Sequence, residues 1–373
     1  MPSSPQRKCW SASTCWRSSG WTLSGWTPPP PLTRRAGDFD ISARHSCAPP
    51  APLPKLAAFV APTIADIHAA AERIAGTAHR TPVLTCGSLD SLAGAALHFK
   101  CENFQKGGAY KFRGALNAVR QLTDKQARHG VVTHSSGNHA TCLALAARQR
   151  GIPAHIVVPR NAPLIKQRAI AAYGGQLTLC EPTLAARQAE ADRIQSATGA
   201  VFIHPYDDPV VIAGQATVGL EFLEQVPLLD VLIAPVSGGG LLSGLCLVAH
   251  ALAPHVEVWG AEPAIADDAF RSLREGKLLA NTNPATIADG LRASLSERTF
   301  TVIRQHARGI VTVTEEHIIS AMRLVWERMK LVVEPSGVVP LAAVLAAPEK
   351  FRGRRVGIIF TGGNVDLDRL PWQ

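Results

Sequence analysis

The feature that most constrains this chain is a series of short apolar segments, rich in β-branched residues and free of polar alternation. Seven of them follow residue 130, at 131–133, 155–158, 176–179, 201–204, 231–236, 256–259 and 356–360. Helical patterns separate most of them, at 140–149, 164–173, 184–196, 210–225 and 315–330. A strand without alternation is buried on both faces, as in a parallel sheet covered by helices. The sequence therefore predicts an α/β fold with doubly wound parallel sheets.

The first sixty residues differ from the rest. They hold four of the seven tryptophans and two proline clusters, and no apolar period runs through them. A secretory signal needs a continuous apolar stretch near the start, which this segment lacks. Its Arg- and Ser-rich composition is typical of organelle transit peptides, but proline and tryptophan interrupt any amphipathic helix. We expect residues 1–60 to be a disordered extension, or sequence upstream of the true start.

Composition narrows the function classes. With 46% hydrophobic and 18% charged residues, the chain can bury a core and is not disordered throughout. Residues 1–60 carry +5 of the net charge of +9, so the basicity belongs mainly to that segment and does not indicate nucleic acid. No apolar run approaches the roughly 20 residues of a membrane helix. Eight scattered cysteines favour reduced thiols, and we therefore expect a cytoplasmic protein. From the charge distribution and the short apolar runs, we expect neither nucleic-acid nor membrane partners.

Four predicted strands end in residues that are suited to ligand binding. The clusters are 134–139 (His-Ser-Ser-Gly-Asn-His), 237–241 (Ser-Gly-Gly-Gly-Leu), the acids Glu262 and Asp268, and 361–364 (Thr-Gly-Gly-Asn). Ligands of open α/β sheets bind beyond the carboxyl ends of the strands. One such loop would be an ordinary turn, whereas four indicate a site.

The glycine run 238–240 precedes a helical pattern, which is typical of a phosphate site. Two interpretations compete for it. Gly238, Gly240 and Gly244 give GxGxxxG, one residue off the dinucleotide spacing, and Glu262 lies about where a ribose-binding acid is expected. That pattern would indicate a nicotinamide-dependent oxidoreductase. The other interpretation is a cofactor with one phosphate and a reactive aldehyde, which requires a lysine.

Lys111 is the candidate for that lysine. It follows Gly107 and Gly108 at the start of an apolar helical pattern. A solvated lysine in a basic turn would account for it locally. A lysine near the positive end of a helix is favoured to lose its proton, as Schiff-base chemistry requires.

Taken together, these motifs resemble the fold-type II pyridoxal-phosphate enzymes, and among them the serine racemase and serine/threonine dehydratase family. The resemblance extends from about Thr63 to about Asp368, with the motifs in order, and includes segments 204–205, 212–215, 287–290, 326–330 and 334–335. It implies a large cofactor-binding domain (61–129 and 208–373) and a small domain (130–207) that carries the substrate loop. It also implies a homodimer.

The resemblance assigns the cofactor site residue by residue. Lys111 holds pyridoxal 5'-phosphate as an imine and, once released, removes the α-proton of the substrate. Asn138 bonds the ring hydroxyl, and Thr361 bonds the pyridine nitrogen, where the family usually has serine. The phosphate is held by the N–H groups of Gly238, Gly239, Gly240 and Leu241.

For the substrate, the resemblance implies an amino acid whose carboxylate is bound by Ser135, Ser136, Gly137, Asn138 and His139. β-Elimination of serine or threonine to a 2-oxo acid and ammonia is the reaction expected first. Ser136 corresponds to the family residue on the opposite face of the cofactor, and two opposed acid/base groups permit racemisation. The alternatives are therefore a serine racemase and, through Arg187, a 3-hydroxyaspartate dehydratase, since Arg187 aligns with an arginine that reaches a second carboxylate. An exposed helical arginine is an equal alternative.

Glu262, Ala266 and Asp268 match the family's divalent-cation site, with a backbone carbonyl from Ala266. Hard oxygen ligands suit Mg²⁺, Ca²⁺ or Mn²⁺.

The sequence also departs from the family pattern. Ala109 and Tyr110 replace serine and phenylalanine before the lysine, and Tyr206 stands where racemases often have asparagine. Thr141 and Arg298 replace amides that bind a nucleotide activator, so we expect no regulation by ATP. The chain ends soon after residue 364, so we also expect no regulatory domain and no feedback control by isoleucine.

Overall fold

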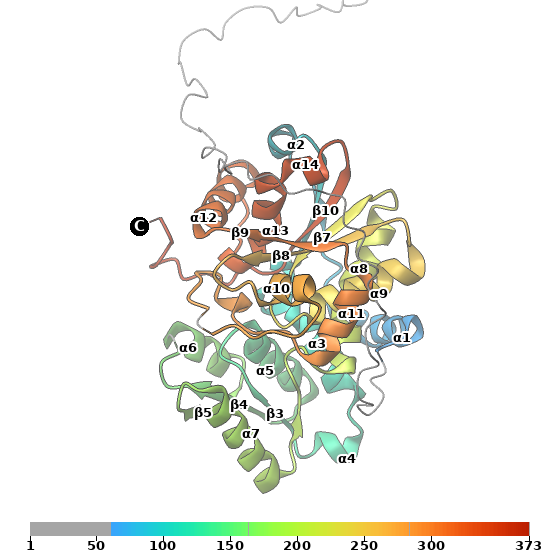
Figure 1. Cartoon of the computed structure of the whole chain (residues 1–373). Helices are drawn as coiled ribbons and strands as arrows, with labels where there is room; N and C mark the ends of the chain where they lie inside the picture. Colours follow the sequence, from blue (N-terminus) through green and yellow to red (C-terminus); the bar gives the residue numbers. More distant parts are fainter. Residues whose placement is uncertain (1–60, 163, 283, 373) are drawn as a thin grey trace, which may run out of the picture. The chain divides into compact units, whose positions relative to one another are not determined.

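The computed structural model describes residues 61–372 except 163 and 283, so the expected N-terminal extension (1–60) lies outside the described residues. Ten strands form two sheets, and the described helices cover both (Figure 1). The two sheets confirm the predicted fold class of two parallel-sheet α/β units. Among the described residues, none of the helices combines the length and apolarity that crossing a membrane requires.

The larger sheet has six strands in the order β1-β2-β10-β7-β8-β9. Only β1 runs antiparallel to its neighbour, β2, and every other pair is parallel. The strands are β1 (Val83–Leu84), β2 (Ala96–Cys101), β7 (Val231–Pro235), β8 (Glu257–Pro263), β9 (Gly309–Val313) and β10 (Arg355–Phe360). β7 and β10 are buried along almost their whole length, as the absence of alternation predicts.

The smaller sheet has four parallel strands in the order β5-β4-β3-β6. They are β3 (Val131–His134), β4 (Ala154–Pro159), β5 (Gln176–Cys180) and β6 (Val201–Phe202). Helices α3, α5 and α6 share a buried cluster with one face, and α7 packs on the other. The strands of this sheet come from 131–202, between two parts of the larger one. The domain boundaries at 130 and 207 stay a prediction.

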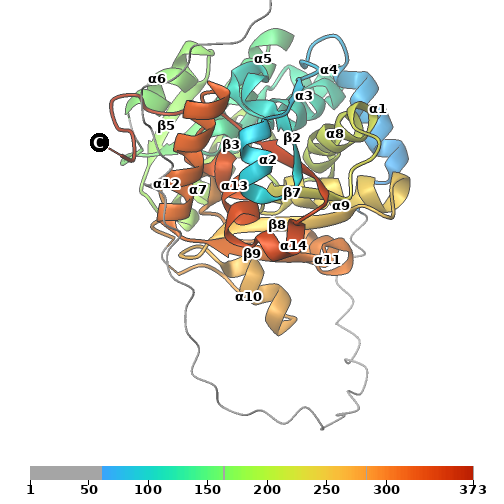
Figure 2. The same ribbon diagram turned by 90° about the horizontal axis from the view of Figure 1, so that it is seen from above.

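The α-helices of the described residues are α1 (Ile64–Ile74), α2 (Gly87–Ala93), α3 (Lys111–Gln121), α4 (Asp124–Ala127), α5 (Asn138–Arg150), α6 (Leu164–Ala172), α7 (Leu184–Thr198), α8 (Pro209–Gln225), α9 (Gly240–Leu252), α10 (Asp268–Glu275), α11 (Glu297–His306), α12 (Glu315–Leu324), α13 (Pro335–Ala346) and α14 (Pro348–Phe351). Helices α2, α12 and α13 cover one face of the larger sheet, and α8, α9 and α11 cover the other. Seen from above, α3 lies beside α8 (Figure 2).

Several element boundaries differ from the sequence prediction, and β8, predicted at 256–259, extends to Pro263. The strand expected at 201–204 ends at Phe202, because the His204 side chain accepts hydrogen bonds from the backbone N–H groups of Tyr206 and Asp207 and turns the chain. The helix expected at 315–330 becomes a π turn at Val325–Met329 and ends at Lys330, whose φ is 59°. Strands β2 and β9 were not predicted.

Candidate active site

Lys111 is the first residue of α3, and the loop before it is fastened to the end of β10. Gly107 and Gly108 both have positive φ (71° and 70°), which favours glycine. The N–H of Tyr110 donates to the Thr361 carbonyl at 3.0 Å, and the N–H of Gly363 donates to the Gly108 carbonyl at 3.0 Å. The predicted lysine and the predicted loop 361–364 are therefore neighbours, although 250 residues separate them in the sequence.

The Lys111 amine lies at the meeting point of both sheets. Its Nζ donates to the carbonyl of Pro205 at 2.8 Å, in the segment that leaves β6. Burial lowers the pKa of Lys111 to about 8. A sizeable fraction of the amine is thus neutral near physiological pH, which is the state of a nucleophile or a base. The sequence interpretation attributed this loss of the proton to the helix end, whereas the structure attributes it mainly to burial.

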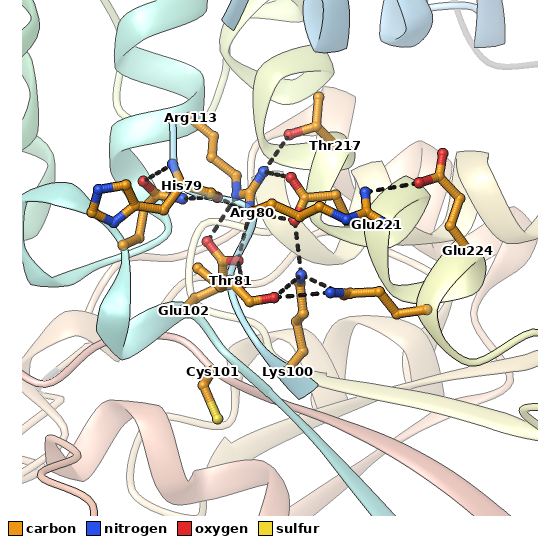
Figure 3. Close-up of polar contacts among 12 residues, drawn as sticks. His79, Arg80, Thr81, Lys100, Cys101, Glu102, Arg113, Thr217, Glu221 and Glu224 are labelled. Carbon is orange, nitrogen blue, oxygen red and sulfur yellow. Dashed lines mark hydrogen bonds and ion pairs between the residues drawn. The ribbon is translucent and has the colours of Figure 1, made fainter. Parts of the chain in front are cut away.

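The start of α3 is held by three buried ionic side chains and one partly buried one, Glu221. We name them the charge cluster: Lys100, Glu102, Arg113 and Glu221 (Figure 3). Arg113 is fully buried two residues after Lys111. Its guanidinium bonds both oxygens of Glu102 at 2.8 Å, and both oxygens of Glu221 at 2.7 and 2.9 Å. Such bidentate pairs fix orientation as well as distance.

Lys100 completes the charge cluster. Its Nζ is fully buried at the end of β2 and uses all three donors, on the Thr81 carbonyl, Glu221 and Gln225, at 2.8 to 2.9 Å. Thr81 also donates its hydroxyl to Glu102 at 2.6 Å. Two positive and two negative side chains therefore join β2, α3 and α8 with every charge compensated. The sequence analysis did not identify this cluster.

Glycines bring α3 and α8 into backbone contact just beyond the charge cluster. A Cβ on Gly214 would lie 2.7 Å from the Cα of Gly114, and one on Gly114 would lie 2.8 Å from the Val211 carbonyl. Neither position can hold a larger residue without moving a helix. Because Lys111 begins α3, the contact also fixes where Lys111 lies relative to α8. Helix α8 begins at Pro209, shortly after Pro205.

The glycine cradle comprises Gly238, Gly239 and Gly240, between β7 and α9, with walls that leave no room for side chains. A Cβ on Gly238 would lie 2.4 Å from the Tyr206 ring, and one on Gly239 would lie 2.6 Å from Leu295. Ser237 and Gly239 both have positive φ, of 52° and 84°. The loop therefore presents backbone rather than side chains, as a phosphate site requires.

The N–H groups of the cradle differ in what they offer. Gly240 and Leu241 occupy the first turn of α9, where the helix itself supplies no acceptor for them. Gly239 instead donates its N–H to the Val236 carbonyl at 3.0 Å. Gly244 packs on Ala216 of α8, so the third glycine of the alternative dinucleotide pattern serves helix contact.

Asn138, at the start of α5, is held from two sides. Its Nδ2 donates to Glu334 at 2.7 Å, and its Oδ1 accepts from Asn364 at 2.9 Å. Burial raises the pKa of Glu334 to about 7, and the hydrogen bond from Asn138 opposes that shift. Glu334 and Asn364 were quoted only as family motifs, so sequence reasoning missed their contacts with Asn138.

The substrate loop lies between β3 and α5. Ser135, Ser136 and Gly137 are all partly exposed, and Ser135 accepts the N–H of Gly137 at 3.4 Å. His139 is buried, with Nε2 3.3 Å from the Ile203 carbonyl, and burial keeps its pKa well below the usual range. Thr361, predicted to bond the pyridine nitrogen, is buried at the end of β10, beside this loop through Gly362 and Asn138.

A row of rings continues from the substrate loop to the cradle: His134, His204 and Tyr206. The centroids are 6.0 Å apart for the histidines and 4.6 Å apart for His204 and Tyr206. Burial and the neighbouring His134 and Lys111 lower the pKa of His204 to about 4, so the ring is neutral. Arg187, on α7, adds to the positive field at His134 and Tyr206. Its own Nε lies 3.4 Å from the Thr183 carbonyl.

Glu262 and Asp268 of the predicted cation site are buried carboxyl groups, and the charge of Asp268 acts on Glu262. Burial, then Asp268, raises the pKa of Glu262, and burial raises that of Asp268 to about 6. Oε1 of Glu262 is buried without a hydrogen-bond partner, and Ala266 is buried between the two acids in the chain. The described part of the chain contains no group of three or more metal-ligating side chains. The predicted cation site offers two carboxylates and a backbone carbonyl.

The comparisons with known proteins agree with this geometry. Residues 74–362 match the family model described as pyridoxal-phosphate dependent enzyme. A curated beta-hydroxyaspartate dehydratase from Paracoccus denitrificans (strain Pd 1222) is 51% identical over 312 residues, covering 84% of this chain and 99% of that protein. A serine racemase from Dictyostelium discoideum is 46% identical over 312 residues, covering 83% of this chain and 96% of that protein.

Solved structures give the same result. Maize serine racemase matches with a TM-score of 0.81 and 46% identity, over 83% of this chain and 95% of that one. A threonine deaminase from T.th. matches with a TM-score of 0.79 and 44% identity, over 82% of this chain and 99% of that one. The family match over residues 74–362 spans both sheets of the described fold.

Proposed function

The chain belongs to the family of pyridoxal-phosphate dependent enzymes, and on that premise we propose that it is a dehydratase of β-hydroxy amino acids that releases a 2-oxo acid and ammonia. The single observation that carries the proposal is the Lys111 amine, whose pKa is lowered to about 8 and whose helix is held by the charge cluster. An amine with that pKa serves as the base that removes a Cα proton.

The residues fit the cofactor. The glycine cradle leaves open backbone where a Cβ would collide with Tyr206 or Leu295, and the first turn of α9 offers N–H donors and a dipole for a phosphate. Asn138 and Thr361 would hold the ring from the two loops that meet beside Lys111. When bound, pyridoxal phosphate supplies an electron sink for negative charge at Cα of the substrate.

The chain's own residues orient the substrate and move its protons. Lys111 Nζ, released to the substrate side, would take the proton from Cα. The partly exposed hydroxyls of Ser135 and Ser136 would bind the substrate carboxylate at the end of β3. Thr361 would place a hydroxyl rather than a carboxylate at the pyridine nitrogen. A hydroxyl does not hold that nitrogen protonated, which favours rapid loss of the β-hydroxyl.

We propose 3-hydroxyaspartate as the preferred substrate within that class. Arg187 contributes positive potential at His134 and Tyr206, along the ring row between the substrate loop and the cradle. A second carboxylate would be favoured there, and a guanidinium binds it in a fork. The 51% identity to a protein named beta-hydroxyaspartate dehydratase supports the same substrate class.

A serine racemase is the second candidate, and Ser136 favours it. A hydroxyl opposite Lys111 could return a proton to Cα from the other face. Several similar proteins carry the name serine racemase. Both reactions begin with the same proton removal, so the products distinguish them.

The experiment is a product assay of the purified chain with threo-3-hydroxyaspartate, L-serine and L-threonine. We expect 2-oxo acid and ammonia from all three, fastest from hydroxyaspartate, and a visible absorption band that Lys111→Ala abolishes. D-serine that accumulates without 2-oxo acid would favour the racemase, and its formation should then require Ser136. A protein that stays colourless with pyridoxal phosphate would contradict both candidates.

Arg187→Ala tests the substrate preference, with Arg193→Ala as the matched control on the same helix. Arg193 is exposed and paired with Glu190, away from the ring row. We expect kcat/KM for hydroxyaspartate to fall about 10- to 100-fold in Arg187→Ala, as the loss of a charged hydrogen-bond pair implies. The value for serine should stay unchanged. Equal losses for both substrates would remove Arg187 from substrate recognition.

We also propose that Glu262, Asp268 and the Ala266 carbonyl bind Mg²⁺, Ca²⁺ or Mn²⁺. The partnerless Oε1 of Glu262, beside a second buried acid, supports this assignment because a cation would relieve both unfavourable charges. Calorimetric titration of the chelator-treated protein with Mg²⁺ should show binding that Glu262→Gln weakens at least tenfold. Identical isotherms for the two proteins would reject the site.

A further inference from the structure

Gln215 has a buried side chain that the functions above do not use. It lies in the middle of α8, and none of its surface is exposed. Neither Oε1 nor Nε2 has a hydrogen-bond partner in the structure. A buried amide that forms no hydrogen bond is unfavourable, and most buried polar side chains avoid it. Such a group indicates an absent ligand or solvent molecule on which the amide acts.

The surroundings of Gln215 show which ligand that is. A Cβ on Gly240 would lie 2.9 Å from Gln215 Oε1, so the amide reaches the first residue of α9. A Cβ on Gly114 would lie 3.0 Å from its Cγ, so the side chain runs between α3 and the glycine cradle. Tyr206 covers the same cradle from the other direction. The amide therefore forms a wall of the part of this site where the N-terminus of α9 offers its N–H groups.

A second glutamine on α8 provides the contrast. Gln225 accepts from Lys100 at 2.8 Å and donates to the Thr81 carbonyl at 3.1 Å, so both ends of its amide are bonded. The same helix thus satisfies a partly buried glutamine fully where it faces the charge cluster. Helix α8 leaves Gln215 without a hydrogen bond next to Gly240 of the glycine cradle. We therefore expect the missing hydrogen-bond partner to be a ligand of the cradle.

We propose that Gln215 is a further cofactor-binding residue: with its amide turned so that Nε2 takes the place of Oε1 beside Gly240, it donates a hydrogen bond to the phosphate of pyridoxal phosphate held at the start of α9. This inference rests on the cofactor of the proposed function. A carboxamide donor adds to the backbone N–H groups without adding charge. It also replaces the contribution of Gly239, whose N–H is bonded to Val236.

The test separates the phosphate from the rest of the cofactor. The cofactor-free full chain is titrated with pyridoxal phosphate and with pyridoxal, which lacks the phosphate, and both dissociation constants are read from absorbance. We expect Gln215→Leu to weaken pyridoxal phosphate about 10- to 100-fold and to leave pyridoxal unchanged. The ³¹P resonance of the bound cofactor should also shift in this variant, because the phosphate loses a donor.

Two further variants keep the test decisive. Gln215→Glu keeps the shape, and its carboxylate should repel the phosphate, so the affinity loss should be larger and should diminish as the pH falls from 8 to 5.5. Gln225→Met removes a partly buried, fully bonded amide of the same helix next to the charge cluster, and it should not change the ratio of the two dissociation constants. Circular dichroism confirms that each variant is folded.

The outcomes are distinguishable. An unchanged constant for pyridoxal phosphate in both Gln215 variants would overturn the inference. Equal weakening of pyridoxal and pyridoxal phosphate would also overturn it, because the side chain would then act on the fold rather than on the phosphate. A wild-type chain that binds neither compound would contradict the proposed function itself, and the inference with it.

Discussion

The charge cluster and the glycine cradle are both built on α8, yet they differ in how completely their polar groups are bonded. In the charge cluster, Arg113 and Lys100 spend their donors on carboxylates, a carbonyl and an amide within the protein. At the cradle, Gln215 has no partner, and the first N–H groups of α9 have none from the helix. The cluster is complete in the chain alone, whereas the cradle is complete only with a ligand.

This difference distinguishes buried polar groups that stabilise the fold from buried polar groups that await a ligand. A buried charge without compensation is strongly unfavourable, so the fold requires the four members of the charge cluster together. We propose that the cradle keeps unsatisfied groups because a bound phosphate would use them. The extent of side-chain burial alone would not distinguish the charge cluster from the glycine cradle. Four variants test the contrast, from the largest expected effect to the smallest.

Arg113→Met should have the largest effect. It leaves Glu102 and Glu221 without their bidentate partner in the interior, and we expect the free energy of unfolding to fall by about 3 to 5 kcal/mol. Urea unfolding of the cofactor-free chain measures it. The change should be as large without cofactor as with it. A loss that appears only in the cofactor-bound protein would place Arg113 with the cradle instead.

Gly239→Ala tests the crowding of the cradle. Its φ of 84° and a Cβ within 2.9 Å of Leu295, Thr299 and Ile303 combine backbone strain with overpacking. Together we expect about 2 to 4 kcal/mol of lost stability. Gly353→Ala is the control, since φ is 73° there but no atom lies within 4 Å of the added Cβ, so only the strain remains. Equal losses in the two variants would mean that the cradle walls yield.

Glu334→Gln should stabilise the cofactor-free chain at high pH. The pKa of Glu334 is raised to about 7, so the folded state binds this proton more tightly than the unfolded state does. Its contribution is complete below the usual carboxyl pKa and is lost as pH rises through 7. At pH 8 we expect the variant to gain about 2 to 3 kcal/mol, and below about 1 kcal/mol at pH 5. Unfolding curves at the two pH values measure it, and a pH-independent gain would exclude titration as the cause.

Arg80→Ala should have the smallest effect. Arg80 pairs with Glu224 beside the charge cluster at 2.9 Å, but the two side chains are 55% and 61% exposed (Figure 3). Exposed pairs contribute below about 1 kcal/mol, so we expect a change of roughly 0.5 kcal/mol or less, further reduced by salt. Thermal unfolding at two salt concentrations measures it. A change comparable to that of Arg113→Met would mean that the cluster extends to the surface.

The sequence contained the fold class and most of the loops that form the site. Apolar strands are local signals, and they predicted the parallel sheets correctly. The ligand-binding roles of the segments 134–139, 237–241 and 361–364 stay predictions. Locally, Lys111 could be a solvated lysine, and the resemblance to the family assigned it to the cofactor. The structure adds that its amine contacts Pro205, which belongs to the segment that leaves the other sheet.

The rest could not be predicted, because it depends on pairs that are far apart in the chain. Strand β2 was missed because His98 and Lys100 interrupt its apolar residues, and the burial of Lys100 depends on acceptors as distant as Glu221, 121 residues later. The contact of Asn138 with Glu334 spans 196 residues. Gln215 belongs to the segment 212–215 that carries the family resemblance, but the sequence did not indicate a role for its side chain, since the same residue type at 225 on the same helix is fully bonded.

The backbone contact between Gly114 and Gly214 has a consequence for redesign. Where two helices are in backbone contact, no side chain can change its rotamer to make room for a larger residue. A new substrate range should therefore be sought in side chains away from this contact, such as Arg187, which we propose binds the substrate. Substitutions that push α3 away from α8 would shift the reactive amine itself, and every reaction of the enzyme would lose speed together.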